Sequence, residues 1–143
     1  MMGYVFMRFG TDFRPENVDR LREKVGECLE RGGIAGPTAF LLLNLMDELI
    51  CNILEHSKAS WVEMEMHPEL TQVKLVLRDD GPLFDPSNAI RGVDAAHVAD
   101  HERSLGLYMV GQIAKSWDYH RINNAVNELN LAVDLDKVTG GVA

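Results

Sequence analysis

The chain has 143 residues, of which 46% are hydrophobic and 25% charged, and its formal net charge at pH 7 is -8. This length suits one domain over residues 1–143 with a core of its own, and the composition excludes disordered, collagen-like and coiled-coil chains. The acidic balance, with Lys and Arg scattered along the chain, argues against a nucleic-acid partner.

No segment of the sequence predicts insertion into a membrane or export. The most apolar stretch, residues 39–46, already contains Asn44 and is far shorter than the roughly 20 apolar residues that cross a bilayer. The N-terminus lacks the basic region and apolar core of an export signal. Cys28 and Cys51 have no metal-binding spacing, so reduced cysteines are expected. We therefore expect a cytoplasmic protein without a membrane partner.

The first part of the chain predicts one strand and two helices. Residues 4–9 predict a short strand, and Pro15 suits the first turn of a helix whose apolar residues recur at helical spacing. Gly32 and Gly33 are expected to end that helix. A second helix is predicted over residues 38–56.

Alternation of apolar and polar residues predicts four further strands. They cover residues 61–66, 73–77, 117–121 and 128–135. Turns join them in pairs, one at residues 67–69, where Pro68 cannot donate to a sheet ladder, and one at Asn123 and Asn124. Between the pairs, a polar stretch over residues 86–103 predicts a long loop, and residues 105–114 predict a helix.

The order of these elements is strand, helix, helix, two strands, loop, helix and two strands. This order favours an α+β fold, a two-layer sandwich with helices on one face of a mostly antiparallel sheet.

The helix predicted over residues 38–56 is apolar around most of its circumference, so we expect it to be largely buried. One narrow polar row runs along it at intervals of four residues, formed by Asn44, Glu48, Asn52 and His56. The row is either a seam that faces solvent or the lining of a cleft. In a cleft, Glu48 could accept a proton and the amide oxygen of Asn52 could hold Mg²⁺, which prefers oxygen ligands.

Two further segments carry residues that suit a nucleotide. Asp79 follows a predicted strand and could accept a hydrogen bond from an exocyclic amine, while Gly81 would let the backbone approach a flat ring. Residues 103–107 lie where a loop leads into a helix, a place that suits phosphate. Taken alone, the first segment is better explained as an ordinary turn, and an ordinary helix start explains the second equally well.

Together and in this order, the three segments resemble the GHKL ATPase superfamily. Residues 48–56 resemble its N box, residues 79–81 its first glycine box and residues 104–108 its second. Within the superfamily, residues 80–86 and 105–110 resemble the anti-sigma factor serine kinases of partner switching. Two positions depart from the pattern, because Leu83 stands where a glycine often follows the first box and Ser104 replaces the first glycine of the second.

This resemblance implies that ATP and Mg²⁺ are the cofactors, and it assigns roles to individual residues. Glu48 would be the catalytic base, Asn52 would bind Mg²⁺ and Asp79 would hold the adenine amine. The residues implied in cofactor binding are Asn52, Asp79, Gly81, Arg103, Ser104, Gly106 and Leu107. The polar loop over residues 87–102 would be a lid over the nucleotide.

The resemblance also implies a function, namely a serine protein kinase that acts as an anti-sigma regulatory factor. Its partners would be a sigma factor and a small antagonist protein that it phosphorylates. Two alternatives remain open: a nucleotide-dependent protein-binding module without phosphotransfer, which the departure at Ser104 supports, and a histidine-kinase-type catalytic domain acting in trans. No acceptor-histidine segment precedes the domain, which disfavours the second alternative. The sequence leaves open whether the chain forms a homodimer.

Overall fold

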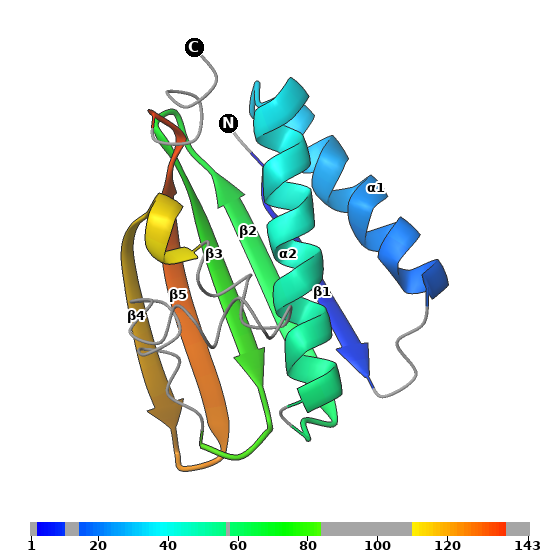
Figure 1. Cartoon of the computed structure of the whole chain (residues 1–143), viewed down its shortest axis with the longest axis vertical. Coiled ribbons are helices and arrows are strands. Elements are labelled where there is room, and N and C mark those ends of the chain that lie inside the picture. The colour runs from blue at the N-terminus through cyan, green and yellow to red at the C-terminus, as the bar shows by residue number, and fades with distance from the viewer. Residues whose placement is uncertain (1–2, 11–14, 57, 84–109, 137–143) are drawn as a thin grey trace, which may run out of the picture.

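The computed structural model describes residues 3–10, 15–56, 58–83 and 110–136 (Figure 1). The labelled elements, in chain order, are β1 (Val5–Gly10), α1 (Pro15–Arg31), α2 (Gly36–His56), β2 (Trp61–Pro68), β3 (Gln72–Asp79), β4 (Ala114–Ile122) and β5 (Val126–Asp134). Residues 110–113 form a short helical segment just before β4.

The five strands form one antiparallel sheet in the order β1-β2-β3-β5-β4. Helices α1 and α2 pack against each other and cover the sheet from one side, over β1 and β2 (Figure 1). This arrangement confirms the expected two-layer α+β fold. In the part of the chain that the structure describes, no helix has the length and apolarity to span a membrane.

The core lies between the helices and the sheet, and strict alternation along the strands builds it. In β2, for example, Val62, Met64 and Met66 are fully buried while the residues between them are only partly covered. Burying large apolar side chains in this way is the main stabilising contribution to such a fold. From α2 the core receives Leu42, Leu45, Met46, Leu49 and Ile50. Helix α2 is therefore largely buried, as its sequence predicts.

Local sequence signals set two of the boundaries as expected. Helix α1 ends at Arg31, and Gly33 follows with a φ of +78°, a conformation that glycine adopts without strain. The turn between β4 and β5 contains Asn123 and Asn124 with φ values of +50° and +54°. Asparagine tolerates this left-handed region better than most residues, which explains why the hairpin reverses here.

Two predicted boundaries are wrong. Pro68 is not in a turn but is the last residue of β2, where it pairs with Val73, and a strand end tolerates a residue without an N–H group. Ala114 does not end a helix but begins β4, which starts three residues before the predicted Trp117. An irregularity of register between Ala114 and Ser116 disturbs the alternation there, so the period-two signal fades.

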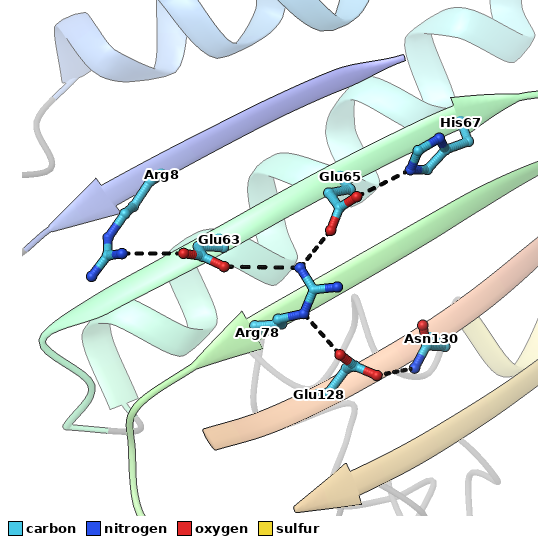
Figure 2. A network of polar contacts seen from close by, with 7 residues as sticks. All are labelled: Arg8, Glu63, Glu65, His67, Arg78, Glu128 and Asn130. Atoms are coloured by element: carbon cyan, nitrogen blue, oxygen red, sulfur yellow. Dashed lines mark hydrogen bonds and ion pairs between the residues drawn. The ribbon is translucent and has the colours of Figure 1, made fainter. Parts of the chain in front are cut away.

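The face of the sheet away from the helices carries a charged network centred on Arg78 (Figure 2). The Arg78 guanidinium contacts Glu65, lies 2.8 Å from Glu128 and lies 3.8 Å from Glu63, whose other oxygen is 3.1 Å from Arg8. These residues come from β1, β2, β3 and β5, which are consecutive in the sheet. The network therefore links four strands across the outer face.

Candidate functional site

Asp79 and Gly81 lie at the C-terminal end of β3. Asp79 is the last residue of the strand and pairs with Val62 of β2 on one side and with Asn127 of β5 on the other. Its side chain belongs to the buried face, and only 7% of the residue is exposed. The backbone N–H of Gly81 donates to Asp79 Oδ1 at 2.8 Å, so the carboxylate closes the turn that follows the strand.

Asn127 is the second buried polar residue at this place, with 5% exposure. Its Nδ2 donates to Asp79 Oδ1 at 3.1 Å, and also to the carbonyl oxygens of Gly81 at 3.3 Å and Pro82 at 2.8 Å. A single amide thus holds both the carboxylate and the backbone of the turn. Buried polar groups in proteins are normally paired in this way because an unpaired one is costly.

Two side chains of β4 hold Asn127 in turn. The Tyr119 hydroxyl donates to Asn127 Oδ1 at 2.6 Å, and Nη1 of Arg121 donates to the same oxygen at 3.0 Å. Arg121 also donates to the carbonyl oxygen of Gly81 at 2.7 Å. We call Tyr119, Arg121 and Asn127 the β4–β5 polar cluster. It joins the last hairpin of the sheet to the turn after β3.

Within the described residues, Nε of Arg121 is the one buried side-chain nitrogen or oxygen atom without a hydrogen-bond partner. Leaving such an atom unsatisfied costs free energy, so native proteins contain few of them.

Burial raises the pKa of the Asp79 carboxyl, and the charge of Asp80 acts in the same direction. Hydrogen bonds from Asn127 and Gly81 and the charge of Arg121 lower it, but the net shift of the pKa is upward. A perturbed carboxyl that is held by fixed donors at the end of a strand is a typical functional-site feature.

Asp80 has a different environment from its neighbour. Its Oδ1 accepts hydrogen bonds from the backbone N–H groups of Ser60 at 2.7 Å and Trp61 at 3.1 Å, and its Oδ2 contacts the Ser60 hydroxyl. Desolvation raises the pKa of Asp80, but the hydrogen bonds from Ser60 and Trp61 outweigh it and leave the pKa lowered. Asp80 fixes the chain just before β2, whereas Asp79 faces the interior.

The polar row on α2 does not form one uniform lining. Asn44 Oδ1 accepts a hydrogen bond from Arg22 of α1 at 2.9 Å, and the same guanidinium nitrogen lies 3.2 Å from Asp47, so Asn44 belongs to the contact between the helices. Glu48 is exposed. Asn52 lies in α2, but its side chain and that of His56 are outside the described residues.

The C-terminal half of α2 and the end of β3 lie at the same end of the molecule (Figure 1). Helix α2 ends at His56, and β2 begins at Trp61, beside the end of β3. The bonds from Ser60 to Asp80 tie the connection between them to the turn that carries Gly81. The two segments that the sequence assigns to a nucleotide site are thus brought together at this end.

The remaining predicted site residues fall outside the described part of the chain. They are Arg103, Ser104, Gly106 and Leu107, together with the lid predicted over residues 87–102. Among the residues that the structure does describe, no group of three or more His, Cys, Asp and Glu side chains could hold a metal ion. The assignment of Asn52 as a metal ligand is not tested by the described residues and stays a prediction from the sequence.

Sequence reasoning missed the β4–β5 polar cluster. A signal for Asn127 exists in the sequence, because it stands two residues before Leu129 in a row that continues with Leu131 and Val133. All four residues lie on the buried face of β5. A polar residue that interrupts such an apolar row is a reason to expect a buried partner.

A family model described as histidine kinase-like ATPase domain matches residues 11–133. The matched span contains α2, the turn after β3 and the β4–β5 polar cluster. No curated protein matches the chain.

Proposed function

The chain belongs to the family of histidine kinase-like ATPase domains, and from this membership we propose that it binds ATP with Mg²⁺ and phosphorylates a serine of a small antagonist protein. In this proposal the protein is an anti-sigma regulatory factor that binds a sigma factor and changes partner with the phosphorylation state of the antagonist. The resemblance of residues 80–86 and 105–110 to the anti-sigma serine kinases supports the finer assignment.

The observation that carries the nucleotide proposal is the environment of Asp79. Its Oδ1 accepts from the N–H of Gly81 and from Asn127, and no described residue donates to Oδ2. Oδ2 can therefore accept a hydrogen bond from the exocyclic amine of adenine, and Gly81 offers backbone without a side chain beside the ring. The residues present thus fit an adenine base.

The C-terminal half of α2 supplies the groups for the phosphoryl end of the nucleotide. The amide oxygen of Asn52 would hold Mg²⁺, whose charge, when it is bound, offsets the negative charge of the phosphates. By the same resemblance, Arg103, Ser104, Gly106 and Leu107 would contact the phosphates. They lie where a loop leads into a predicted helix, which suits that role, because N–H groups at a helix start bind anions.

The transfer step needs a base for the incoming hydroxyl. Glu48 would accept the serine proton while the serine oxygen bonds to the terminal phosphorus and the bond to the bridging oxygen of ADP breaks. The exposure of Glu48 supports this role, because a hydroxyl on another protein has to reach the base. Positioning of the two reactants would supply much of the acceleration.

Incubation with terminally labelled ATP and small antagonist domains from the same genome tests the proposal. We expect label on a serine of one antagonist, in a form that is stable to acid. Label that acid removes, on a histidine of the acceptor, would support a histidine-kinase-type activity instead. Binding of nucleotide and partner without any transfer would identify a binding module.

A further inference from the structure

We propose that Asn127, held by Tyr119 and Arg121, is a positioning residue that presents Oδ2 of Asp79 as a hydrogen-bond acceptor. In this way the site would select a base with an exocyclic amine over a base with a carbonyl at the same position. The inference rests on the proposed nucleotide binding and assigns its base selectivity to residues of the last hairpin.

The first step is the orientation of the Asn127 amide. A guanidinium group has only donors, so the atom of Asn127 that lies 3.0 Å from Arg121 Nη1 has to be the amide oxygen. The opposite edge of the amide faces three acceptors, which are Asp79 Oδ1 and the carbonyl oxygens of Gly81 and Pro82. Both edges agree, so the amide has one favourable orientation.

The second step is the effect of this orientation on Asp79. Oδ1 receives two N–H donors, one from Asn127 and one from Gly81, so it cannot carry a proton without losing one of them. In the described part of the structure, no donor reaches Oδ2. When the carboxyl is ionised, Oδ2 is an acceptor for an amine, whereas a carbonyl oxygen in the same place would meet it with no hydrogen between them.

The third step is the fixed position of the cluster. Arg121 donates to the carbonyl oxygen of Gly81 at 2.7 Å and to that of Asn124 at 3.2 Å. Asn124 is one of the two residues with positive φ in the β4–β5 turn. The guanidinium thus connects the turn of the last hairpin directly to the turn after β3. The Asn127 amide, which donates to Asp79, is bound to this same guanidinium and is thereby fixed relative to both turns.

A purely structural cluster would not need this arrangement. It places a buried amide in an otherwise apolar row and leaves Arg121 Nε without a partner among the described residues. Apolar side chains could fill the same space without that cost. The arrangement is expected where the orientation of a particular acceptor matters more than stability.

The test compares calorimetric binding of ADP and inosine diphosphate, which carries a carbonyl in place of the amine. Wild type should prefer ADP, and Asn127→Ala should reduce this preference by about tenfold, the size expected for losing one hydrogen bond to a charged group. Asn130→Ala is the matched control, because Asn130 lies on the same strand but faces outward and contacts Glu128. Its preference should equal that of the wild type.

Two further variants keep the test decisive if Asn127→Ala does not fold. Tyr119→Phe removes only a hydroxyl and should lower the preference for ADP several-fold, by roughly the value of one neutral hydrogen bond. Asp79→Asn should reverse the preference, because the new amide has to turn its oxygen toward the two donors and its N–H groups toward the base.

The outcomes separate this inference from the proposed function. Wild type that binds neither nucleotide overturns the proposed function itself. Wild type that binds ADP, with an unchanged preference in folded Asn127→Ala or in Tyr119→Phe, overturns the positioning role alone. An equal loss of affinity for both nucleotides in these variants would show that the cluster only supports the fold, and would also overturn the positioning role.

Discussion

Asp79 and Asp80 are neighbours in the chain, but their carboxylates bind different parts of the fold. Asp79 is buried and bound by Asn127, whereas Asp80 is bound by the N–H groups of Ser60 and Trp61 before β2. Because the two residues have the same side chain and are adjacent, the same substitution at each position distinguishes a carboxylate that serves the site from one that serves the fold.

The first prediction uses this pair. Asp79→Asn should weaken ATP and ADP binding by roughly 10- to 100-fold, because it removes a hydrogen bond to a charged acceptor. Asp80→Asn should leave the affinity nearly unchanged, although it weakens the attachment of Ser60. Titration calorimetry of both variants measures this difference. No detectable heat from wild-type protein that is folded would contradict the adenine site.

The second prediction concerns the stability of Asp79→Asn without nucleotide. The pKa of Asp79 in the folded protein is raised above the ordinary 3.8, so the folded state binds this proton more tightly than the unfolded chain. The group therefore opposes folding increasingly as the pH rises above that value. Asp79→Asn should melt at a higher temperature than wild type at pH 7, and the difference should vanish near pH 3. A lower melting temperature at pH 7 would show that the ionised carboxylate stabilises the fold.

The third prediction concerns Arg78, which holds three carboxylates on the outer face (Figure 2). Arg78→Met should lower the free energy of unfolding by about 2 kcal/mol, because it leaves partly buried carboxylates without their cation. Denaturant unfolding at pH 7 measures the loss. Lys74→Met, on the same strand and face, is the control, because its pairing with Glu69 is exposed and should matter little.

The pH dependence of the same network follows from two lowered pKa values. The hydrogen bond from Arg78 lowers the pKa of Glu65, and those from Asn130 and Arg78 lower the pKa of Glu128, both from an ordinary 4.5. A lowered carboxyl pKa gives stability that is present above the unfolded value and is lost as the pH falls. Wild type should lose stability below about pH 4.5, and Arg78→Met should lose less over the same range. Parallel acid unfolding of the two proteins would contradict the network.

Much of the fold follows from periodicity and local signals. The alternation in β2 and β3 and the glycines after α1 place these elements to within a few residues. The prediction was wrong at Pro68, where a strand end accommodates a residue that usually breaks strands, and at Ala114, where a register irregularity hides the alternation. Such local exceptions depend on the neighbouring strand and are not encoded in the segment itself.

The candidate site was predictable only in part. Asp79 and Gly81 are in one short motif, and the structure places them in a single closed turn. Asn127 lies 48 residues after Asp79 in the chain. The last strand was predicted to begin at Glu128, one residue after Asn127, whereas β5 begins at Val126. Asparagine is a poor strand former, so propensity excluded the residue that the sheet register places directly opposite Asp79.

The fourth prediction concerns the metal ligand proposed on α2. Asn52→Ala should weaken ATP binding in the presence of Mg²⁺ and slow phosphotransfer, because both depend on the same cation. Affinity measured in excess chelator should differ little between variant and wild type. Calorimetry with and without Mg²⁺ gives this comparison. Equal weakening under both conditions would indicate that Asn52 contacts the nucleotide or supports the helix instead.

The fifth prediction separates the kinase from a binding module. It depends on the different proposed roles of Glu48, the base, and Asn52, the Mg²⁺ ligand, which lie one turn apart on α2. Glu48→Gln keeps the shape of the side chain but removes its capacity to accept a proton. Nucleotide affinity and partner binding should stay near wild type, whereas phosphorylation should slow by roughly 10²- to 10⁴-fold, as for the loss of a positioned base. Single-turnover transfer to the antagonist, with ATP above its dissociation constant, measures this step.

Glu27→Gln is the control for that measurement, because Glu27 is an exposed carboxylate on α1 that pairs with Arg31. Its transfer rate should equal that of the wild type, since a change of surface charge on α1 has no part in the reaction. If Glu48→Gln transfers at the wild-type rate, Glu48 is not the base and the proton leaves by another route. If wild type binds its partner and nucleotide but transfers nothing, both variants are uninformative about catalysis and the protein is a nucleotide-dependent binding module.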